Sequence, residues 1–269
     1  MTPLRLGISP CPNDTYIFFA LLRHFQDQLP VEVHFHDIEE LNQLALEGAY
    51  DAVKISCALL DSVSAEYGLL RSGGALGRGC GPLLVSAGAK ALFPGARVLS
   101  PGRHTTAQRL FQRYCPLSVN LEYRLFSDIM EALAAGKADF GILIHESRFT
   151  YQEHGLSLVQ DLGVWWEETT GAPIPLGGIV LRRSCDPALA SQLETLIRQS
   201  IAYARNHRAE VLDFCRQYAQ EIDDAVMGSH IELYVNQYSH DIGPDGIRAI
   251  AYLLFGDHTA EPNFLWSQT

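Results

Sequence analysis

The stretch ADFGILIHESRFTY, residues 138–151, decides the fold that this sequence predicts. An apolar run from Phe140 to Ile144 is followed at once by the polar residues His145 and Glu146. This pattern is typical of a buried strand that delivers polar side chains to the carboxyl edge of a sheet, where open α/β sheets bind ligands. Histidine takes and returns a proton near neutral pH, so His145 is the leading candidate for a general base. A hydrogen-bonded structural histidine is the alternative, and position alone leaves both roles open.

A second stretch shows the same order of features. In residues 44–56 a helix end, a glycine and, three residues later, an aspartate precede an apolar run that ends at Lys54-Ile55-Ser56. Residues 133–145 repeat this order, again with the glycine and the aspartate three residues apart. We predict one helix–strand unit used in two separate lobes, with chance similarity as the alternative. If the lobes face each other, Ser56 and His145 look into one cleft from opposite walls.

The composition is that of a globular protein, since 47% of the 269 residues are apolar and 19% are charged. The length suits one large domain or two of moderate size. Only 20 Lys and Arg stand against 31 Asp and Glu, for a net charge of −11, so we expect no nucleic-acid partner. We also expect no membrane partner, because no apolar stretch approaches the roughly 20 residues that a transmembrane helix needs.

The first ten residues, MTPLRLGISP, lack the basic segment, apolar core and cleavage site of a signal peptide. The six cysteines are scattered without a C-x-x-C pair, which favours reduced thiols over disulfides or structural zinc. We therefore expect a cytoplasmic protein without a metal. His34 and His36 have a spacing that a metal could use, but no third ligand stands nearby in the sequence. An exposed pair at a sheet edge is the favoured interpretation.

The order of the elements predicts an α/β fold with parallel strands. Residues 4–9, 31–36 and 52–56 have the pattern of strands, and helical patterns separate them. Asn13-Asp14-Thr15 offers three capping side chains at the start of the first helix.

Five glycines stand in residues 73–81, and we interpret this segment as a crossover between the lobes, with an ordinary loop as the alternative. Residues 1–80 and 177–269 are expected to form the first lobe, which includes the C-terminal helices. Residues 81–176 are expected to form the second. The tail after Gly256 is expected to be loose.

Thr105 and Thr106 stand directly before a helix expected from Ala107 onward. Side-chain hydroxyls, the unbonded N–H groups of a first turn and the helix dipole can together hold an anion such as a carboxylate. A plain threonine N-cap is the alternative, and the sequence does not decide between them.

Four motifs in this order resemble one family, the 1,4-dihydroxy-6-naphthoate synthases of the futalosine route to menaquinone. The motifs are Ser9-Pro10-Cys11-Pro12-Asn13-Asp14-Thr15, residues 71–79 (RSGGALGRG), residues 101–106 (PGRHTT) and residues 144–151 (IHESRFTY). The likeness covers nearly the whole chain, including residues 165–167 and 234–236.

The resemblance implies a two-lobed type II periplasmic-binding-protein fold with a central cleft, in a cytoplasmic enzyme. It implies a lyase that opens and aromatises cyclic dehypoxanthine futalosine to dihydroxynaphthoate, with loss of a sugar-derived three-carbon fragment. No metal and no organic cofactor is implied. His145 takes the place of the family's proton acceptor, and the family's substrate-binding positions fall on Lys54-Ile55-Ser56 and Thr106-Ala107.

This substrate carries an aryl carboxylate and several sugar hydroxyls. Thr105 and Thr106 with the helix N-terminus suit the carboxylate, and Lys54 and Ser56 can hold polar groups from the opposite lobe. Asn13 and Asp14 are expected to hydrogen-bond the substrate or to orient the imidazole.

Several alternatives share this fold. Chorismate dehydratase of the same pathway is the runner-up among enzymes, and a cytoplasmic protein that only binds a small carboxylate is the rival from another class. A ligand-sensing regulator is disfavoured because no DNA-binding segment is attached. The C-terminal helices could also serve a homodimer.

Overall fold

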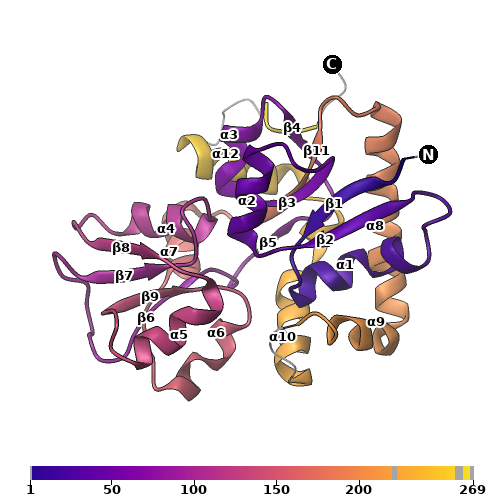
Figure 1. Ribbon diagram of the computed structural model, residues 1–269. Helices are drawn as coiled ribbons and strands as arrows, with labels where there is room; N and C mark the ends of the chain where they lie inside the picture. The colour runs from indigo at the N-terminus through magenta and orange to yellow at the C-terminus, as the bar shows by residue number, and fades with distance from the viewer. Residues whose placement is uncertain (1, 220–222, 258–262, 267–269) are drawn as a thin grey trace.

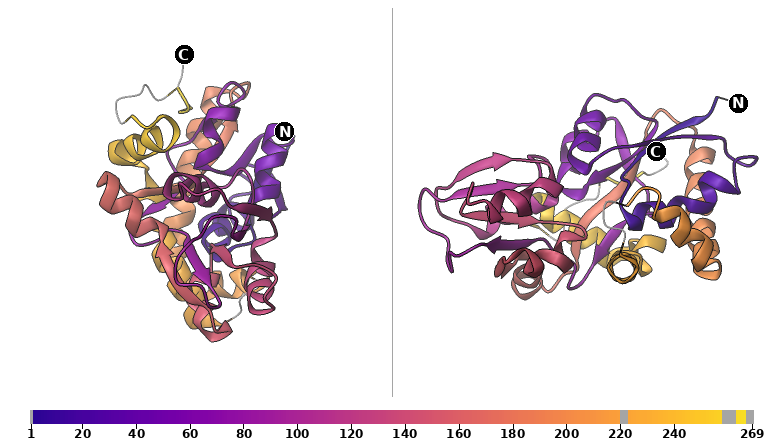
Figure 2. Two further views of the ribbon diagram at one scale, coloured as in Figure 1. Left: turned by 90° about the vertical axis from the view of Figure 1, so that its left-hand side faces the viewer. Right: turned by 60° about the horizontal axis from the view of Figure 1, so that its bottom comes forward.

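The computed structural model describes residues 2–219, 223–257 and 263–266, which form two halves that lie side by side (Figures 1 and 2). Each half is built on one mixed β-sheet. The spatial order of strands in the first sheet is β2 (Val31–Phe35), β1 (Leu4–Ile8), β3 (Ala52–Ser56), β11 (Ile174–Arg182) and β4 (Tyr67–Leu69), and β5 (Ala75–Gly77) also pairs with β11. In the second sheet it is β10 (Ser157–Asp161), β6 (Leu83–Ser86), β9 (Phe140–Leu143), β7 (Arg97–Ser100) and β8 (Asn120–Tyr123). The predicted α/β class is confirmed.

Helices pack around both sheets. They are α1 (Pro12–Arg23), α2 (Ile38–Leu46), α3 (Leu60–Val63), α4 (Thr106–Tyr114), α5 (Phe126–Ala134), α6 (Ser147–Thr150), α7 (Leu162–Thr170), α8 (Pro187–Asn206), α9 (Arg208–Cys215), α10 (Asp224–Tyr234), α11 (Gln237–His240) and α12 (Gly243–Phe255), with short 3-10 turns at Cys57–Leu59 and Tyr151–His154. Successive strand residues face opposite helices. Val98 and Phe140 join the apolar cluster that includes residues of α4, whereas Leu99 and Leu143 join the cluster that includes residues of α5.

The two predicted helix–strand units have the same strand pairing and the same aspartate hydrogen bond in their sheets. β1 pairs in parallel with β2 and β3, and β7 pairs in parallel with β8 and β9. Asp51 Oδ2 accepts from the backbone N–H of Arg5 at 2.9 Å, and Asp139 Oδ2 accepts from that of Arg97 at 2.8 Å. Asp51 therefore fixes the start of β3 beside β1, and Asp139 fixes the start of β9 beside β7. The carboxyl ends of β3 and β9 therefore occupy corresponding positions in the two sheets.

The chain passes from β5 to β6 through residues 78–82 and returns through β11, which pairs with both β5 and β3. We propose the division into residues 1–80 with 177–269 and residues 81–176 on the basis of this strand pairing. At the passage the backbones of Gly81 and Gly163 touch, and a Cβ atom on Gly81 would overlap Gly163 Cα and N. A glycine is therefore required at this point of the crossover.

The prediction of a loose tail is wrong for the described residues 263–266, while residues 258–262 and 267–269 lie outside the described part. The backbone N–H of Leu69 donates to Phe264 O at 2.7 Å, and that of Trp266 donates to Leu69 O at 2.8 Å. Phe264 is fully buried. Burial of this aromatic ring stabilises the pairing of the segment with β4.

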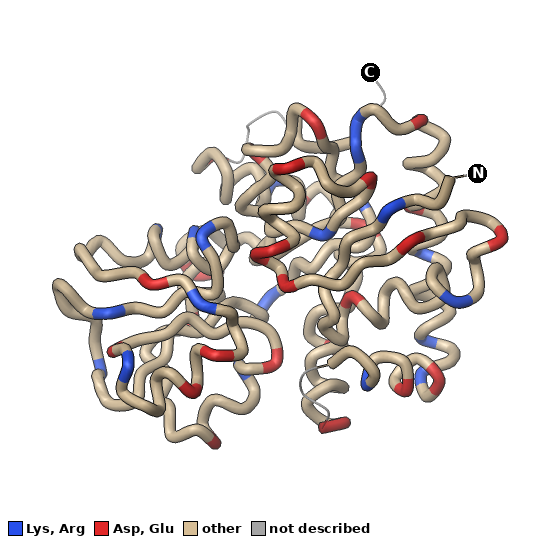
Figure 3. The backbone as a smooth tube through the Cα atoms, viewed as in Figure 1, with Lys and Arg blue, Asp and Glu red and all other residues tan. Residues whose placement is uncertain are grey.

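Charged residues of both signs are interspersed along the chain in both halves (Figure 3). In the part of the chain that the structure describes, Figure 3 shows no long run of basic residues of the kind that tracks a nucleic-acid backbone. Within the described residues, no helix combines the length and the apolar character needed to cross a bilayer.

The contact between Gly81 and Gly163 gives a test of the crossover. We expect Gly81→Ala to lower the free energy of unfolding by about 1–3 kcal/mol, because the added methyl group must displace backbone. Gly88→Ala is the matched control, since a Cβ there has no atom within 4 Å. Its effect should stay within about 0.5 kcal/mol. Urea unfolding measures both, and equal stability of the two variants would contradict the close approach.

Candidate active site

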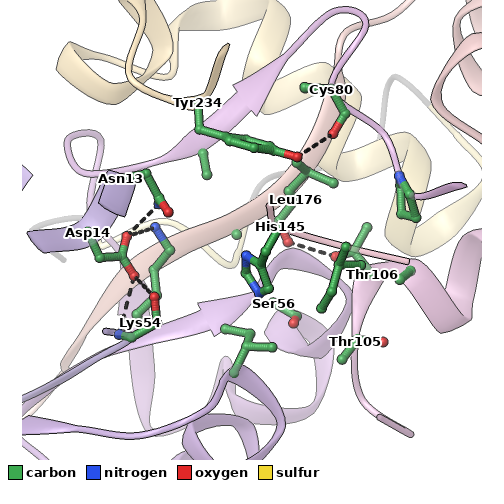
Figure 4. A pocket seen from close by; sticks show the side chains of 17 residues that line it. Asn13, Asp14, Lys54, Ser56, Cys80, Thr105, Thr106, His145, Leu176 and Tyr234 are labelled. Atoms are coloured by element: carbon green, nitrogen blue, oxygen red, sulfur yellow. Dashed lines mark hydrogen bonds and ion pairs between the residues drawn. The ribbon is translucent and has the colours of Figure 1, made fainter. Parts of the chain in front are cut away.

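A pocket with an empty volume of about 630 Å³ lies where elements of both halves meet. The first half contributes Asn13 and Asp14 from the start of α1, and Lys54 and Ser56 from the end of β3. The second half contributes Thr105, Thr106 and Ala107 at the start of α4, and His145 after β9. Figure 4 shows Asp14 and Lys54 on one side, the two threonines on the other, and the imidazole between them.

Lys54 and Asp14 form a buried ion pair in the wall of the pocket. Lys54 Nζ lies 2.8 Å from Asp14 Oδ1, and the two residues are 3% and 1% exposed. Asp14 Oδ2 also accepts from the Ser9 hydroxyl at 2.7 Å, and Lys54 Nζ donates to Gly73 O at 3.3 Å. Because the ammonium is already paired, Lys54 presents a neutralised group to a ligand.

Asn13 extends this pair toward α10. Its Nδ2 donates to Asp14 Oδ1 at 2.9 Å, and its Oδ1 lies 3.0 Å from Nε2 of His230, which is fully buried. Since an amide oxygen only accepts, His230 donates its Nε2 proton to Asn13. Asn13 and Asp14 make no direct contact with His145 among the hydrogen bonds of the described residues, so they do not orient the imidazole directly.

His145 follows β9 in a strained backbone conformation. Its φ of 55° is the only positive φ of a non-glycine residue in the described part of the chain. Such strain persists only where the surroundings hold the residue in place, and it gathers at functional sites. The ring packs edge-on against Phe126 at 4.8 Å between centroids, and Nδ1 lies 3.6 Å from the thiol sulfur of Cys11.

The second ring nitrogen, Nε2, is buried and has no hydrogen-bond partner among the described residues. Burial lowers the pKa of His145 from 6.5 to about 4, an effect that Asp14 opposes and Lys54 reinforces. The imidazole is therefore neutral at physiological pH. In the tautomer whose Nδ1–H points at the Cys11 sulfur, Nε2 carries the lone pair that a general base needs.

We expected the hydroxyls of Thr105 and Thr106 to hold a carboxylate, but both form hydrogen bonds within the protein. Thr105 is the N-cap: its Oγ1 accepts from Gln108 N at 3.2 Å and donates to Gly102 O at 2.9 Å. The Thr106 hydroxyl donates to Leu176 O at 2.8 Å. What remains for an anion is the first turn, where the N–H groups of Thr106 and Ala107 precede any intrahelical acceptor.

Ser56 and Ile55 differ in what they offer to a ligand. Ser56 lines the pocket, where its Oγ accepts from Asn42 Nδ2 at 3.0 Å and its hydroxyl proton can reach a ligand. Ile55 is fully buried in the apolar core and does not line the pocket, unlike the other predicted site residues. Alternation along β3 accounts for this, because neighbouring residues of a strand face opposite sides.

The two halves are also joined beside the pocket. The carboxylate of Glu39 at the start of α2 accepts from the backbone N–H of Arg103 at 2.9 Å and from that of His104 at 3.0 Å. These amides precede α4, so one acidic side chain of the first half holds the loop that carries the anion-binding turn.

Sequence reasoning missed four residues around His145: Cys11, Glu146, His230 and Tyr234. Cys11 was grouped with the scattered thiols, although its place between two prolines before α1 fixes its direction. His230 Nδ1 lies 3.8 Å from Glu146 Oε2, and Tyr234 lines the pocket one helical turn further on. His230 and Tyr234 lie far from residue 145 in the sequence, so no local pattern links them to it. Cys11, Glu146 and Tyr234 stand in segments of the family resemblance, which was the available signal.

Two mixed sheets with a pocket between them form the architecture that this chain shares with periplasmic binding proteins. The structure is similar to the periplasmic aliphatic sulphonate binding protein SsuA from Escherichia coli, with a TM-score of 0.63, 12% identity and coverage of 87% of this chain and 79% of that one. That similarity shows the fold alone. A protein from Archaeoglobus fulgidus is more similar, with a TM-score of 0.87, 28% identity and coverage of 93% and 95%. The predicted periplasmic-binding-protein-like fold is confirmed.

The sequence comparisons identify the family within this fold. The model of a family described as "Menaquinone biosynthesis" matches residues 4–255. The 1,4-dihydroxy-6-naphtoate synthase of Thermus thermophilus is 48% identical over 254 residues, which are 94% of this chain and 93% of that protein. The chain therefore belongs to the 1,4-dihydroxy-6-naphthoate synthases, enzymes of menaquinone biosynthesis, and the resemblance stated from its motifs is confirmed.

The ion pair in the pocket wall can be tested by removing one charge or both. Asp14→Ala leaves the Lys54 ammonium buried without a counter-ion and should lower the free energy of unfolding by about 3–5 kcal/mol. The double variant Asp14→Ala with Lys54→Met removes both charges and should lose clearly less. Urea unfolding of the three proteins measures this difference. Equal losses would show that the pairing of these two charges does not govern stability.

Proposed function

We propose that this enzyme converts cyclic dehypoxanthine futalosine to 1,4-dihydroxy-6-naphthoate by carbon–carbon cleavage, with His145 as the general base. The family membership supports the product. The observation that carries the role of His145 is its Nε2, a buried ring nitrogen without a hydrogen-bond partner in the described structure, on an imidazole that lines the pocket. The proposal includes a cytoplasmic, cofactor-independent enzyme, as expected from the sequence.

The start of α4 supplies a place for the substrate carboxylate. The N–H groups of Thr106 and Ala107, together with the positive end of the helix dipole, attract a carboxylate without a lysine or arginine. Thr105 caps the helix and Thr106 ties it to β11 through Leu176 O, so both hold the turn in position. The neutralised Lys54 leaves this turn as the stronger anion site of the two.

Ser56 faces this turn from the other half of the pocket. Its hydroxyl is suited to the sugar-derived oxygens, because it can donate outward while Asn42 Nδ2 donates to it. Leu176 and Ile144 add apolar surface on which a flat ring system can lie. Glu39, which holds the loop before α4, keeps the two groups of substrate contacts at a fixed separation.

His145 starts the chemistry from this arrangement. The neutral imidazole takes the proton of a substrate hydroxyl at Nε2, and the resulting alkoxide becomes a carbonyl as the neighbouring carbon–carbon bond breaks. The electron pair of that bond moves toward the ring ketone, and aromatisation drives the steps that follow. The tautomer that the reaction needs is the one in which Nδ1–H donates a hydrogen bond to the Cys11 sulfur, 3.6 Å away.

Replacement of the base gives the central test. We expect His145→Ala to lower kcat by about 10²–10⁴-fold, because general base catalysis contributes that much, while calorimetry still detects substrate binding. The matched control is His154→Ala, which removes an exposed histidine outside the pocket and should leave turnover unchanged. Undiminished turnover by His145→Ala would remove this residue from the mechanism. Wild-type protein that binds the substrate without turnover would instead favour the solute-binding alternative.

A second experiment separates binding from chemistry. Ser56→Ala and Thr106→Ala should raise KM more than they lower kcat, since these residues hold the substrate or the turn that binds it. Steady-state kinetics with cyclic dehypoxanthine futalosine measures both constants, and chorismate is the control substrate that should give no product. A fall in kcat at unchanged KM in both variants would contradict the division of roles.

A further inference from the structure

Three metal-ligating side chains converge beside the pocket. The sulfur of Cys11, a ring nitrogen of His145 and a carboxylate oxygen of Glu146 all lie within 4.8 Å of one another. Cys11 and Glu146 are buried, and His145 is half-buried at the pocket surface. Of the three, His145 lines the pocket and is therefore the group that a small ion in the pocket meets first.

The spacing of sulfur and nitrogen fits a tetrahedral zinc ion. Bonds of about 2.3 Å to sulfur and about 2.0–2.1 Å to nitrogen at a tetrahedral angle separate the two ligand atoms by about 3.5 Å. Cys11 Sγ and His145 Nδ1 are 3.6 Å apart. These two ligand atoms are already at the separation that the ion requires, and the Glu146 carboxylate, within 4.8 Å of both, would complete the set.

His230 provides an independent observation. Its Nε2–H is donated to Asn13 Oδ1, so the neutral ring carries its lone pair on Nδ1. Nδ1 is buried without a hydrogen-bond partner among the described residues and lies 3.8 Å from Glu146 Oε2. An unprotonated ring nitrogen and a carboxylate oxygen are both acceptors, so a cation bound at Glu146 would relieve their mutual repulsion. A buried lone pair thus faces the carboxylate of the group.

We infer that Cys11, His145 and Glu146 form a site for a thiophilic divalent cation, with Zn²⁺ as the ion of best fit. The Cys11 S–H bond is replaced by a sulfur–metal bond, and its proton leaves to solvent. The thiolate and the carboxylate then balance the two charges of the ion. No oxidant or reductant takes part.

The consequence for turnover rests on the proposed function. A metal on Nδ1 forces the remaining ring proton onto Nε2, so the imidazole loses the lone pair that takes the substrate proton. Binding of zinc is therefore inhibitory and reversible by a chelator. The site makes the enzyme sensitive to free zinc.

Cobalt and zinc titrations of the full chain test the site without any substrate. We expect one Co²⁺ per chain with the near-ultraviolet absorption of a thiolate–cobalt bond, and displacement of that Co²⁺ by Zn²⁺. Cys11→Ser should abolish this absorption. Cys11→Ser and Glu146→Gln should each weaken Zn²⁺ about tenfold or more in competition with a chromophoric chelator. The matched control is Cys115→Ser with Cys185→Ser, which removes the two half-buried thiols and keeps the site.

The outcomes separate cleanly. Retention of the cobalt absorption by Cys11→Ser, or its loss in the control variant, would overturn the site. If thermal unfolding shows that Cys11→Ser is misfolded, Glu146→Gln decides, and unchanged zinc affinity there overturns it. In the turnover assay, zinc should stop the wild type and EDTA should restore it, and full turnover of zinc-loaded protein would refute the inhibition. Wild-type protein that binds zinc but never turns over the substrate would refute the proposed function and leave the site standing.

Discussion

The buried ion pair between Lys54 and Asp14 is the interaction on which the site depends. It joins the end of β3 to the start of α1, two elements that each carry further pocket residues. Two charges taken out of water cost several kcal/mol each, so the pair is stable only because Ser9 and Asn13 supply additional hydrogen bonds to the carboxylate. Through Asn13 the same carboxylate reaches His230 and the C-terminal helices. One wall of the pocket is thereby fixed as a unit.

The opposite wall is fixed by a different means. α4 and β9 belong to the second half, which repeats the strand arrangement of the first, down to the aspartate that bonds the edge of each unit. Glu39, and Ala58 through its backbone N–H to the Thr106 hydroxyl, then tie α4 to the first half. Because both walls are rigid, the strained backbone at His145 can be held between them, with Phe126 and Cys11 against its ring. Strain of this kind is stored where neighbouring structure compensates for it.

The electrostatic character of the pocket follows from these contacts. The chain has a net charge of −11 and its pocket lysine is already paired, so its charged side chains offer little attraction to the anionic substrate that we propose. The N-terminus of α4 supplies this attraction instead, since partial charges on N–H groups attract a carboxylate without adding a charged side chain. The same low-polarity surroundings keep the His145 imidazole neutral and the Cys11 thiol protonated, because burial depresses the pKa of the first and raises that of the second.

The sequence by itself determined the α/β class, the two repeated helix–strand units and 8 of the 17 residues that line the pocket. These predictions rest on local patterns, namely apolar runs, glycine stops and capping side chains, which a short stretch of chain expresses on its own. The resemblance of four motifs also determined the family.

Only the tertiary structure decided what each side chain does there. The pairing of Lys54 with Asp14 and the bond from Thr106 to Leu176 join residues 40 and 70 positions apart. The burial of Ile55 depends on residues still further along the chain, such as Gly178 of the neighbouring strand. The group of Cys11, His145 and Glu146 with His230 joins residues from the first helix, a strand end and α10. No local pattern specifies such contacts, because they arise from the packing of whole elements against one another. The sequence patterns therefore named residues of the site, and the packing of the elements decided which partner each side chain bonds to.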